Sequence, residues 1–285
     1  MPDHCAPALA AVAARDSITE HAFAEAVAPV VSFLRTQPRN RLGALDHLGV
    51  QTILRRVYPA SIWIDSLMMY AATAVALGRA LDDDALVDFG SAQPRIFAAV
   101  LQDHDTHLFR HAFLETRQRP RPQTPTFWLR GNGWVVAALA DMLEHEHPSR
   151  EDNVAIFERL TRALLDRQCD DGRWPTVLGD PTTYREASGS ALVAYGLAKG
   201  SRLGLLGRRA RTAAWRTFQA LTSSLRPRAD GLSLPGISGP TIPGPRLAYA
   251  LVPRFADVDY GVGAFCLLAA ELSLHGAGQS SLGSA

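Results

Sequence analysis

The stretch from Phe127 to Trp134, Phe-Trp-Leu-Arg-Gly-Asn-Gly-Trp, carries side chains suited to binding a flat polar ring. Two tryptophans can stack on the ring, a guanidinium and an amide can hydrogen-bond to it, and two glycines allow close backbone approach. A helix predicted over Trp134–Glu146 follows, so the polar residues fall near a helix N-terminus, where backbone N–H groups are free. The stretch predicts a sugar-binding site, with a well-packed helix start as the alternative.

Asp65 is the carboxyl group with the clearest potential for catalysis. It stands in a run from Ser61 to Leu81 that is apolar nearly all round, the pattern of a helix covered on both sides. Burial there is costly unless the charge is paired, shared or removed, and desolvation would raise the pKa into a useful range for an acid. We predict a catalytic Asp65, with helix capping or pairing to Arg130 or Arg185 as the alternative.

Metal binding is only weakly indicated. His104, His107 and His111 are spaced by three and four residues, but the Asp-His-Asp-Thr segment that begins at Asp103 predicts a turn rather than one helical face. The triple aspartate at 82–84 is typical of a solvated helix cap, and the three cysteines lack ligand spacing. We therefore expect no metal ion, no other cofactor and no disulfide framework.

Composition sets the broad class of the protein. The chain has 285 residues, of which 47% are hydrophobic, and 29 basic residues against 28 acidic ones. Near-balanced charge argues against partners such as nucleic acid or an anionic membrane. No apolar run is long enough to span a membrane, and the N-terminus lacks a secretion signal. We expect a cytoplasmic protein with a small-molecule substrate.

Four segments rich in small apolar residues recur, beginning near Asp65, Asn132, Ser188 and Asp259. Each has polar or aromatic groups at its start, and amphipathic helices alternate with these segments. An inner ring of buried helices inside an outer ring of amphipathic ones accounts for the pattern. The sequence therefore predicts an all-α toroid whose inner helices gather their polar starts around one mouth.

The remaining segments complete this expected domain. An irregular loop rich in Gly and Pro over 227–253 is expected to border a site. We predict a single domain over 1–275 and a flexible tail over 276–285. Further helices are predicted over 19–36, 45–57, 84–102, 149–168 and 203–225.

Several motifs, in this order, resemble those of glycoside hydrolase families 88 and 105, the unsaturated glucuronyl and rhamnogalacturonyl hydrolases. Two early segments are similar to family motifs, Trp-Ile-Asp-Ser-Leu-Met from Trp63 and Leu-Phe-Arg-His-Ala from Leu108. The later ones are Phe-Trp-Leu-Arg-Gly-Asn-Gly-Trp at 127–134, Asp-Gly-Arg-Trp at 171–174, Tyr-Arg-Glu-Ala-Ser-Gly-Ser at 184–190 and Asp-Tyr-Gly-Val-Gly-Ala-Phe at 259–265.

The resemblance, which covers 62–274, implies an (α/α)6 barrel with one N-terminal hairpin trimmed. It also implies an unusual chemistry, in which an acid protonates the C4=C5 double bond of a 4,5-unsaturated uronic acid. Water then adds at C5, and the hemiketal opens to expel the aglycone. In the family one Asp is the general acid and base, and a second Asp, which Asp65 matches, assists at the ring.

The sequence departs from the family at two places. The segment 117–123, where the acid/base Asp is expected, reads Arg-Gln-Arg-Pro-Arg-Pro-Gln and has no carboxylate, and Tyr260 replaces a His. Since Glu115 is the nearest upstream carboxyl group, we predict Asp65 and Glu115 as catalytic residues. The basic loop would suit a carboxylate or phosphate ligand.

Three functions remain open at this point. One is hydrolysis of an unsaturated uronide. Another is a repurposed cyclase, dehydratase or isomerase acting on a polyunsaturated biosynthetic intermediate, and the third is a sugar-binding paralogue without turnover. The residues predicted to contact the substrate in any of these cases are Trp63, His111, Trp128, Arg130, Asn132, Trp134, Trp174, Arg185, Glu186 and Tyr260.

Overall fold

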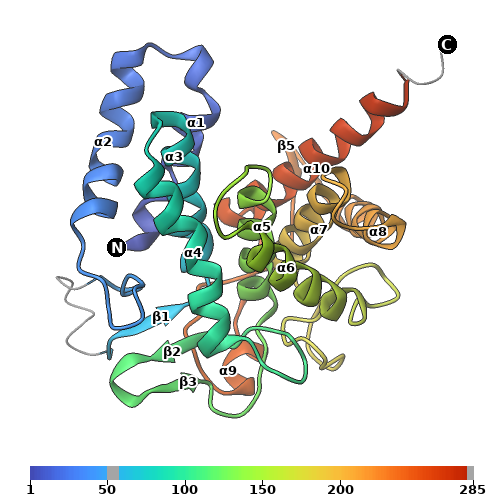
Figure 1. Ribbon diagram of the computed structural model, residues 1–285. Coiled ribbons are helices and arrows are strands. Elements are labelled where there is room, and N and C mark those ends of the chain that lie inside the picture. The colour runs from blue at the N-terminus through green and yellow to red at the C-terminus, as the bar shows by residue number, and fades with distance from the viewer. Residues whose placement is uncertain (50–57, 281–285) are drawn as a thin grey trace.

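Helices make up most of the protein, which the computed structural model describes over residues 1–49 and 58–280, with side chains through 274 (Figure 1). The α-helices are α1 (Ala8–Ala13), α2 (Glu20–Thr36), α3 (Thr73–Leu81), α4 (Asp84–Leu101), α5 (Leu129–Met142), α6 (Arg150–Leu165), α7 (Ala187–Arg202), α8 (Arg208–Ser224), α9 (Arg246–Ala250) and α10 (Asp259–Ser280). A π-helical segment, Leu67–Ala72, leads into α3.

The strands are short and lie in three small antiparallel sheets. They are β1 (Ser61–Trp63), β2 (Ala112–Leu114), β3 (Arg119–Arg121), β4 (Arg226–Arg228), β5 (Gly231–Ser233), β6 (Ile237–Ser238) and β7 (Arg254–Phe255).

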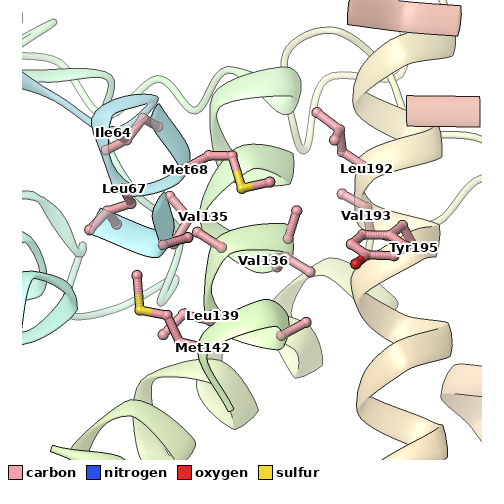
Figure 2. Packing of buried hydrophobic residues seen from close by; sticks show 14 of the residues in the cluster. Ile64, Leu67, Met68, Val135, Val136, Leu139, Met142, Leu192, Val193 and Tyr195 are labelled. Carbon is pink, nitrogen blue, oxygen red and sulfur yellow. The ribbon is translucent and has the colours of Figure 1, made fainter. Parts of the chain in front are cut away.

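The inner helices pack in chain order, as predicted. α5 lies against both the π-helical segment and α7, and α7 lies against α10. Figure 2 shows side chains of α5, including Val135 and Val136, between Met68 on one side and Leu192 on the other. α6 and α8 each bury a single stripe of side chains, which is typical of outer helices. The predicted alternation of buried and amphipathic helices is therefore confirmed for α5 to α8, whereas α10, predicted as an inner helix, leaves Leu267 and Leu274 exposed.

Close approach of α5 and α7 depends on a glycine. A Cβ atom added at Gly196 would lie 2.1 Å from Cγ1 of Val136, far inside van der Waals contact. At the C-terminal ends of the same helices, Lys199 is buried and its Nζ lies 2.8 Å from Asp141 and 2.7 Å from Glu144. The small-residue composition of α7 thus permits tight packing, and a buried ion-pair cluster closes the end away from the helix starts.

Some element boundaries differ from those predicted. α5 begins at Leu129, because Trp128 takes the extended N-cap conformation and the polar residues enter the first turn. The part of the predicted 45–57 helix that is described, 45–49, is not helical; the Asp46 carboxylate instead accepts hydrogen bonds from the backbone of Leu48 and Ser61. Residues 50–57 lie outside the described residues. α10 continues to Ser280, past the predicted start of the tail.

The three-stranded sheet lies at the end of the molecule where the inner helices begin. β1 pairs with β2 and β2 with β3, so that Trp63, Ala112 and Arg121 stand in one row. β1 runs directly toward the π-helical segment, and α9 lies nearby at the same end of the molecule (Figure 1). Within the described ranges, no helix is both long and apolar enough to cross a membrane.

Candidate active site

Asp65 and His111 meet at the mouth formed by this sheet and the helix starts. Asp65 follows β1 and His111 precedes β2, and Ile64 N donates to the His111 carbonyl at 3.0 Å, which holds the two segments together. Asp65 Oδ2 lies 3.5 Å from His111 Nε2. Both atoms are buried, and apart from this long contact with each other neither has a hydrogen-bond partner among the residues that the structure describes. Since buried polar atoms are rarely left unpaired, the pair marks a place for a substrate hydroxyl or a water molecule.

A hydrogen-bond chain sets the tautomer of His111. Gly244 N donates to the Tyr249 hydroxyl at 3.2 Å, and that hydroxyl lies 3.1 Å from His111 Nδ1. Since this hydroxyl already accepts from Gly244 N, its own proton is free to be donated to Nδ1, and in that arrangement the neutral imidazole carries its proton on Nε2, which faces Asp65. The mouth therefore presents an N–H donor beside a carboxylate acceptor.

The pKa of Asp65 is shifted in the direction opposite to the sequence-based prediction. Burial acts to raise it, but the hydrogen-bonding and charge interactions of His111, with His47 and Arg130, outweigh burial and lower the pKa below its ordinary range. The expectation of a raised pKa is wrong because it considered desolvation without these neighbours. Burial lowers the pKa of His111, so at neutral pH an ionised Asp65 faces a neutral imidazole.

Aromatic rings surround Asp65 and His111. His111 stacks on Trp128 with ring centroids 4.4 Å apart, and the edge of Trp63 approaches His111 at 5.3 Å. His47 stacks on Trp63 at 4.3 Å, and Tyr249 lies parallel to Trp128 at 6.3 Å. The structure thus brings together three residues predicted as ligand contacts, Trp63, His111 and Trp128, next to Asp65.

Three residues of this cluster, Asp3, His47 and Tyr249, were not predicted from the sequence. His47 Nδ1 lies 2.9 Å from the Ser66 hydroxyl and 3.9 Å from Asp3 Oδ1. Partial burial raises the pKa of Asp3, and burial lowers that of His47. No motif marks these positions; for Tyr249 the only signal was its location in the loop expected to border a site.

Arg130 is buried and bonded to the protein. Its guanidinium lies between the rings of Trp128 and Tyr260, 4.7 Å from each centroid. It donates to the carbonyl and hydroxyl of Ser238 at 2.7 and 2.8 Å and to the Gly239 carbonyl at 2.9 Å. Arg130 therefore fastens the start of α5 to the Gly- and Pro-rich loop, and Tyr260 is part of that junction.

Asn132, Trp174 and Glu186 are also fully buried. The Asn132 amide accepts from Phe109 N and donates to its carbonyl, while Trp174 Nε1 donates to the Leu164 carbonyl at 2.7 Å. Glu186 caps α7 through backbone N–H groups of its first turn. These residues hold loops against helices, and their contact with a substrate stays a prediction.

Glu115, Trp134 and Arg185 lie on other surfaces. Glu115 Oε1 accepts from Arg41 N at 3.3 Å, beyond the end of β2 that is remote from His111. Trp134 faces an apolar hollow along α10, and Arg185 lies 3.8 Å from Asp171 in another hollow. Their predicted roles likewise stay predictions.

Two further features bear on the chemistry of the mouth. Arg121 pairs with Ala112, the residue after His111, and segment 117–123 of this loop contains no carboxylate. His104 is fully exposed, away from buried His111. No group of three or more His, Cys, Asp or Glu side chains that could hold a metal ion occurs within the described part of the chain.

Known proteins resemble this chain in sequence and in fold. The family model described as Glycosyl Hydrolase Family 88 matches residues 3–274. An unsaturated rhamnogalacturonyl hydrolase of Bacillus subtilis (strain 168) is 31% identical over 173 residues, which are 60% of this chain and 49% of that protein. An unsaturated 3S-rhamnoglycuronyl hydrolase of Alteromonas sp. (strain LOR) is 30% identical over 50% of this chain and 36% of that protein. The chain thus matches half or less of these relatives.

Solved structures agree with the predicted architecture. A family 105 glycoside hydrolase of C. acetobutylicum ATCC 824 superposes with a TM-score of 0.85 at 26% identity, over 96% of this chain and 80% of that one. The unsaturated glucuronyl hydrolase of Bacillus sp. GL1 superposes with a TM-score of 0.72 at 20% identity, over 94% and 72% of the two chains. The (α/α)6-barrel fold predicted from the motifs is confirmed.

Proposed function

Since this chain belongs to glycosyl hydrolase family 88, we propose that it hydrolyses 4,5-unsaturated uronyl glycosides, with Asp65 as the catalytic base. The observation that carries the proposal is the pair of unpartnered atoms at the mouth, Asp65 Oδ2 and His111 Nε2, 3.5 Å apart between aromatic walls. Two relatives whose names specify unsaturated glycuronyl substrates support the same substrate class.

In the proposed reaction, Trp63 and Trp128 contact the unsaturated ring, and His111 Nε2–H and Asp65 Oδ2 hold a water molecule. The water oxygen bonds to C5 while a proton adds to C4, and Asp65 takes a proton from the water. The resulting hemiketal opens and the aglycone leaves. An ionised Asp65 suits this role, because a base must be unprotonated before the water is attacked.

The proton for C4 requires an acid that keeps its proton at working pH. We assign this role to Asp3, whose Oδ1 lies 3.9 Å from His47 Nδ1 in the same cluster; its side chain is 48% exposed, and burial of the remainder raises its pKa. Two carboxyl groups with oppositely shifted pKa values are the usual arrangement of an acid and a base. Asp3 loses a proton to C4 as Asp65 gains one from water, and exchange with solvent restores both before the next turnover.

The test uses unsaturated uronyl disaccharides, with loss of the ultraviolet absorbance of the double bond as the readout. The proposal expects turnover by the natural chain and a large loss in Asp65→Asn. Saturable binding without turnover would instead identify a sugar-binding protein. Conversion to a product that keeps its aglycone would identify a non-hydrolytic enzyme.

The role of Asp3 is tested separately with Asp3→Asn. We expect a lower kcat, little change in KM, and loss of the alkaline limb of the pH profile that an acid group produces. An unchanged kcat and an unchanged pH profile would exclude Asp3 as the proton donor without affecting the assignment of Asp65.

A further inference from the structure

Four arginines line a hollow of about 490 Å³ beside β3. They are Arg117, Arg119 and Arg121 from the loop that lacks the expected carboxylate, and Arg246 at the start of α9. Prolines and threonines form much of the remaining wall, and no Asp or Glu occurs among the described lining residues. The hollow has the volume of a small-molecule site and a strongly positive lining.

The four arginines differ in the partners that their side chains already have within the protein. Arg121 Nε donates to the Pro243 carbonyl at 2.8 Å, and Arg246 pairs with Asp180. Arg117 and Arg119 have no side-chain hydrogen bond or ion pair to any other described residue. The Arg119 side chain is half-buried. Two guanidinium groups are therefore available to an anion in a wall to which Arg121 adds a third positive charge, whereas the charge of Arg246 is compensated by Asp180.

Two sets of residue contacts connect the wall of the hollow with the mouth. Trp63 and Arg121 stand in the same row of the sheet, two strand spacings or about 10 Å apart, with the Tyr58 ring against both. Gly244, which lines the hollow, donates to Tyr249. Tyr249, which is fully buried, in turn contacts His111, so the hollow and the mouth are neighbours separated by aromatic side chains.

We infer that this hollow binds an anionic ester group, a sulfate or a phosphate, carried by the aglycone of the substrate. The inference rests on the proposed function and adds a substrate class to it. Guanidinium groups present paired N–H donors that match two oxygens of such a group at once, and they stay charged at any working pH. A neutral aglycone would leave Arg117 and Arg119 without a partner.

A second arginine-lined hollow differs from the first in how far its arginines are neutralised by carboxylates. Arg173, Arg185, Arg226 and Arg254 line it, but Asp171 pairs with Arg173 at 2.9 Å and lies 3.8 Å from Arg185. Its positive charge is therefore partly neutralised within the protein. In the first hollow, among the residues that the structure describes, a single carboxylate, that of Asp180, pairs with one of the arginines, Arg246.

The experiment compares two unsaturated disaccharides that share the uronyl residue and differ in one sulfate ester on the aglycone. For the natural chain we expect kcat/KM to be about tenfold or more higher for the sulfated compound, and the preference to shrink with added salt. Arg119→Ala should lower kcat/KM for the sulfated compound by about ten- to a hundredfold and leave the other unchanged. Arg117→Ala should act in the same direction, and Arg159→Ala, an exposed arginine on α6, is the matched control.

Each result decides between defined outcomes. Equal kcat/KM for both disaccharides overturns the inference and leaves the proposed function standing. If neither is turned over, the proposed function fails, and calorimetric titration of the sulfated compound into the natural chain and Arg119→Ala still tests the hollow. If inorganic sulfate binds in an Arg119-dependent manner but the disaccharides behave alike, the site takes a free anion and the assignment to the aglycone is wrong.

Discussion

Replacing Asp65 with asparagine removes the charge at the centre of the mouth while keeping the volume of the side chain. The Asp65 side chain is 15% exposed and Oδ2 faces His111 Nε2 at 3.5 Å, so bulk water is poorly placed to replace the lost base. A general base contributes about 10² to 10⁴ in rate, or about 3 to 5 kcal/mol in the barrier. We expect kcat of Asp65→Asn to fall by about a hundredfold or more.

The assay is the loss of double-bond absorbance, with Glu115→Gln as the comparison variant. Because the amide oxygen of Asn can still accept a hydrogen bond from His111 Nε2–H, we expect the free energy of unfolding to change by only about 1 kcal/mol, which thermal melts will check. Full turnover by Asp65→Asn at unchanged stability would refute our reasoning. A large loss in Glu115→Gln with activity kept in Asp65→Asn would restore Glu115 as the acting carboxyl group.

Three further predictions concern stability. Burial lowers the pKa values of His47 and His111 from 6.5, so below about pH 6.5 the unfolded chain binds protons more readily than the folded protein. The free energy of unfolding should therefore fall as the pH is lowered from about 6.5, and urea unfolding at a series of pH values measures it. Gly196→Ala should cost about 1 to 3 kcal/mol, whereas Gly263→Ala, with open space around it, should cost nothing, as measured by thermal unfolding. Lys199→Met should cost about 2 to 3 kcal/mol at neutral pH in urea unfolding, because Asp141 loses the cation paired with it and Glu144 keeps only Arg202.

The anion test in the arginine hollow and the test of Asp65 are independent. A variant of Arg119 should alter discrimination between aglycones, whereas a variant of Asp65 should alter turnover of every substrate. If both variants changed only kcat for all substrates alike, the hollow would be part of the reacting centre rather than a separate subsite. Measuring kcat and KM separately for each compound distinguishes the two cases.

Patterns in the amino-acid sequence were sufficient to predict the class of fold and the principal candidate residues. Apolar periodicity and small-residue composition are local properties, so they predicted the alternating helices and their approximate positions. The motifs that contain Trp63, Asp65, His111 and Trp128 were recognisable because each is short and continuous. Helix ends were less accurate at α5, where Trp128 fixes the start through its backbone conformation rather than through a capping side chain.

The contacts among these residues follow from the tertiary structure alone. His47, Asp65 and His111 lie in turns and loops, Asp3 lies in a 3-10 helix and Tyr249 in α9, so no periodic pattern predicts that they meet. Burial alone would have raised the pKa of Asp65, and the neighbours supplied by distant segments reverse that direction. The pKa of a group depends on the charges and hydrogen-bond donors within a few ångströms, and folding, not sequence proximity, sets those distances.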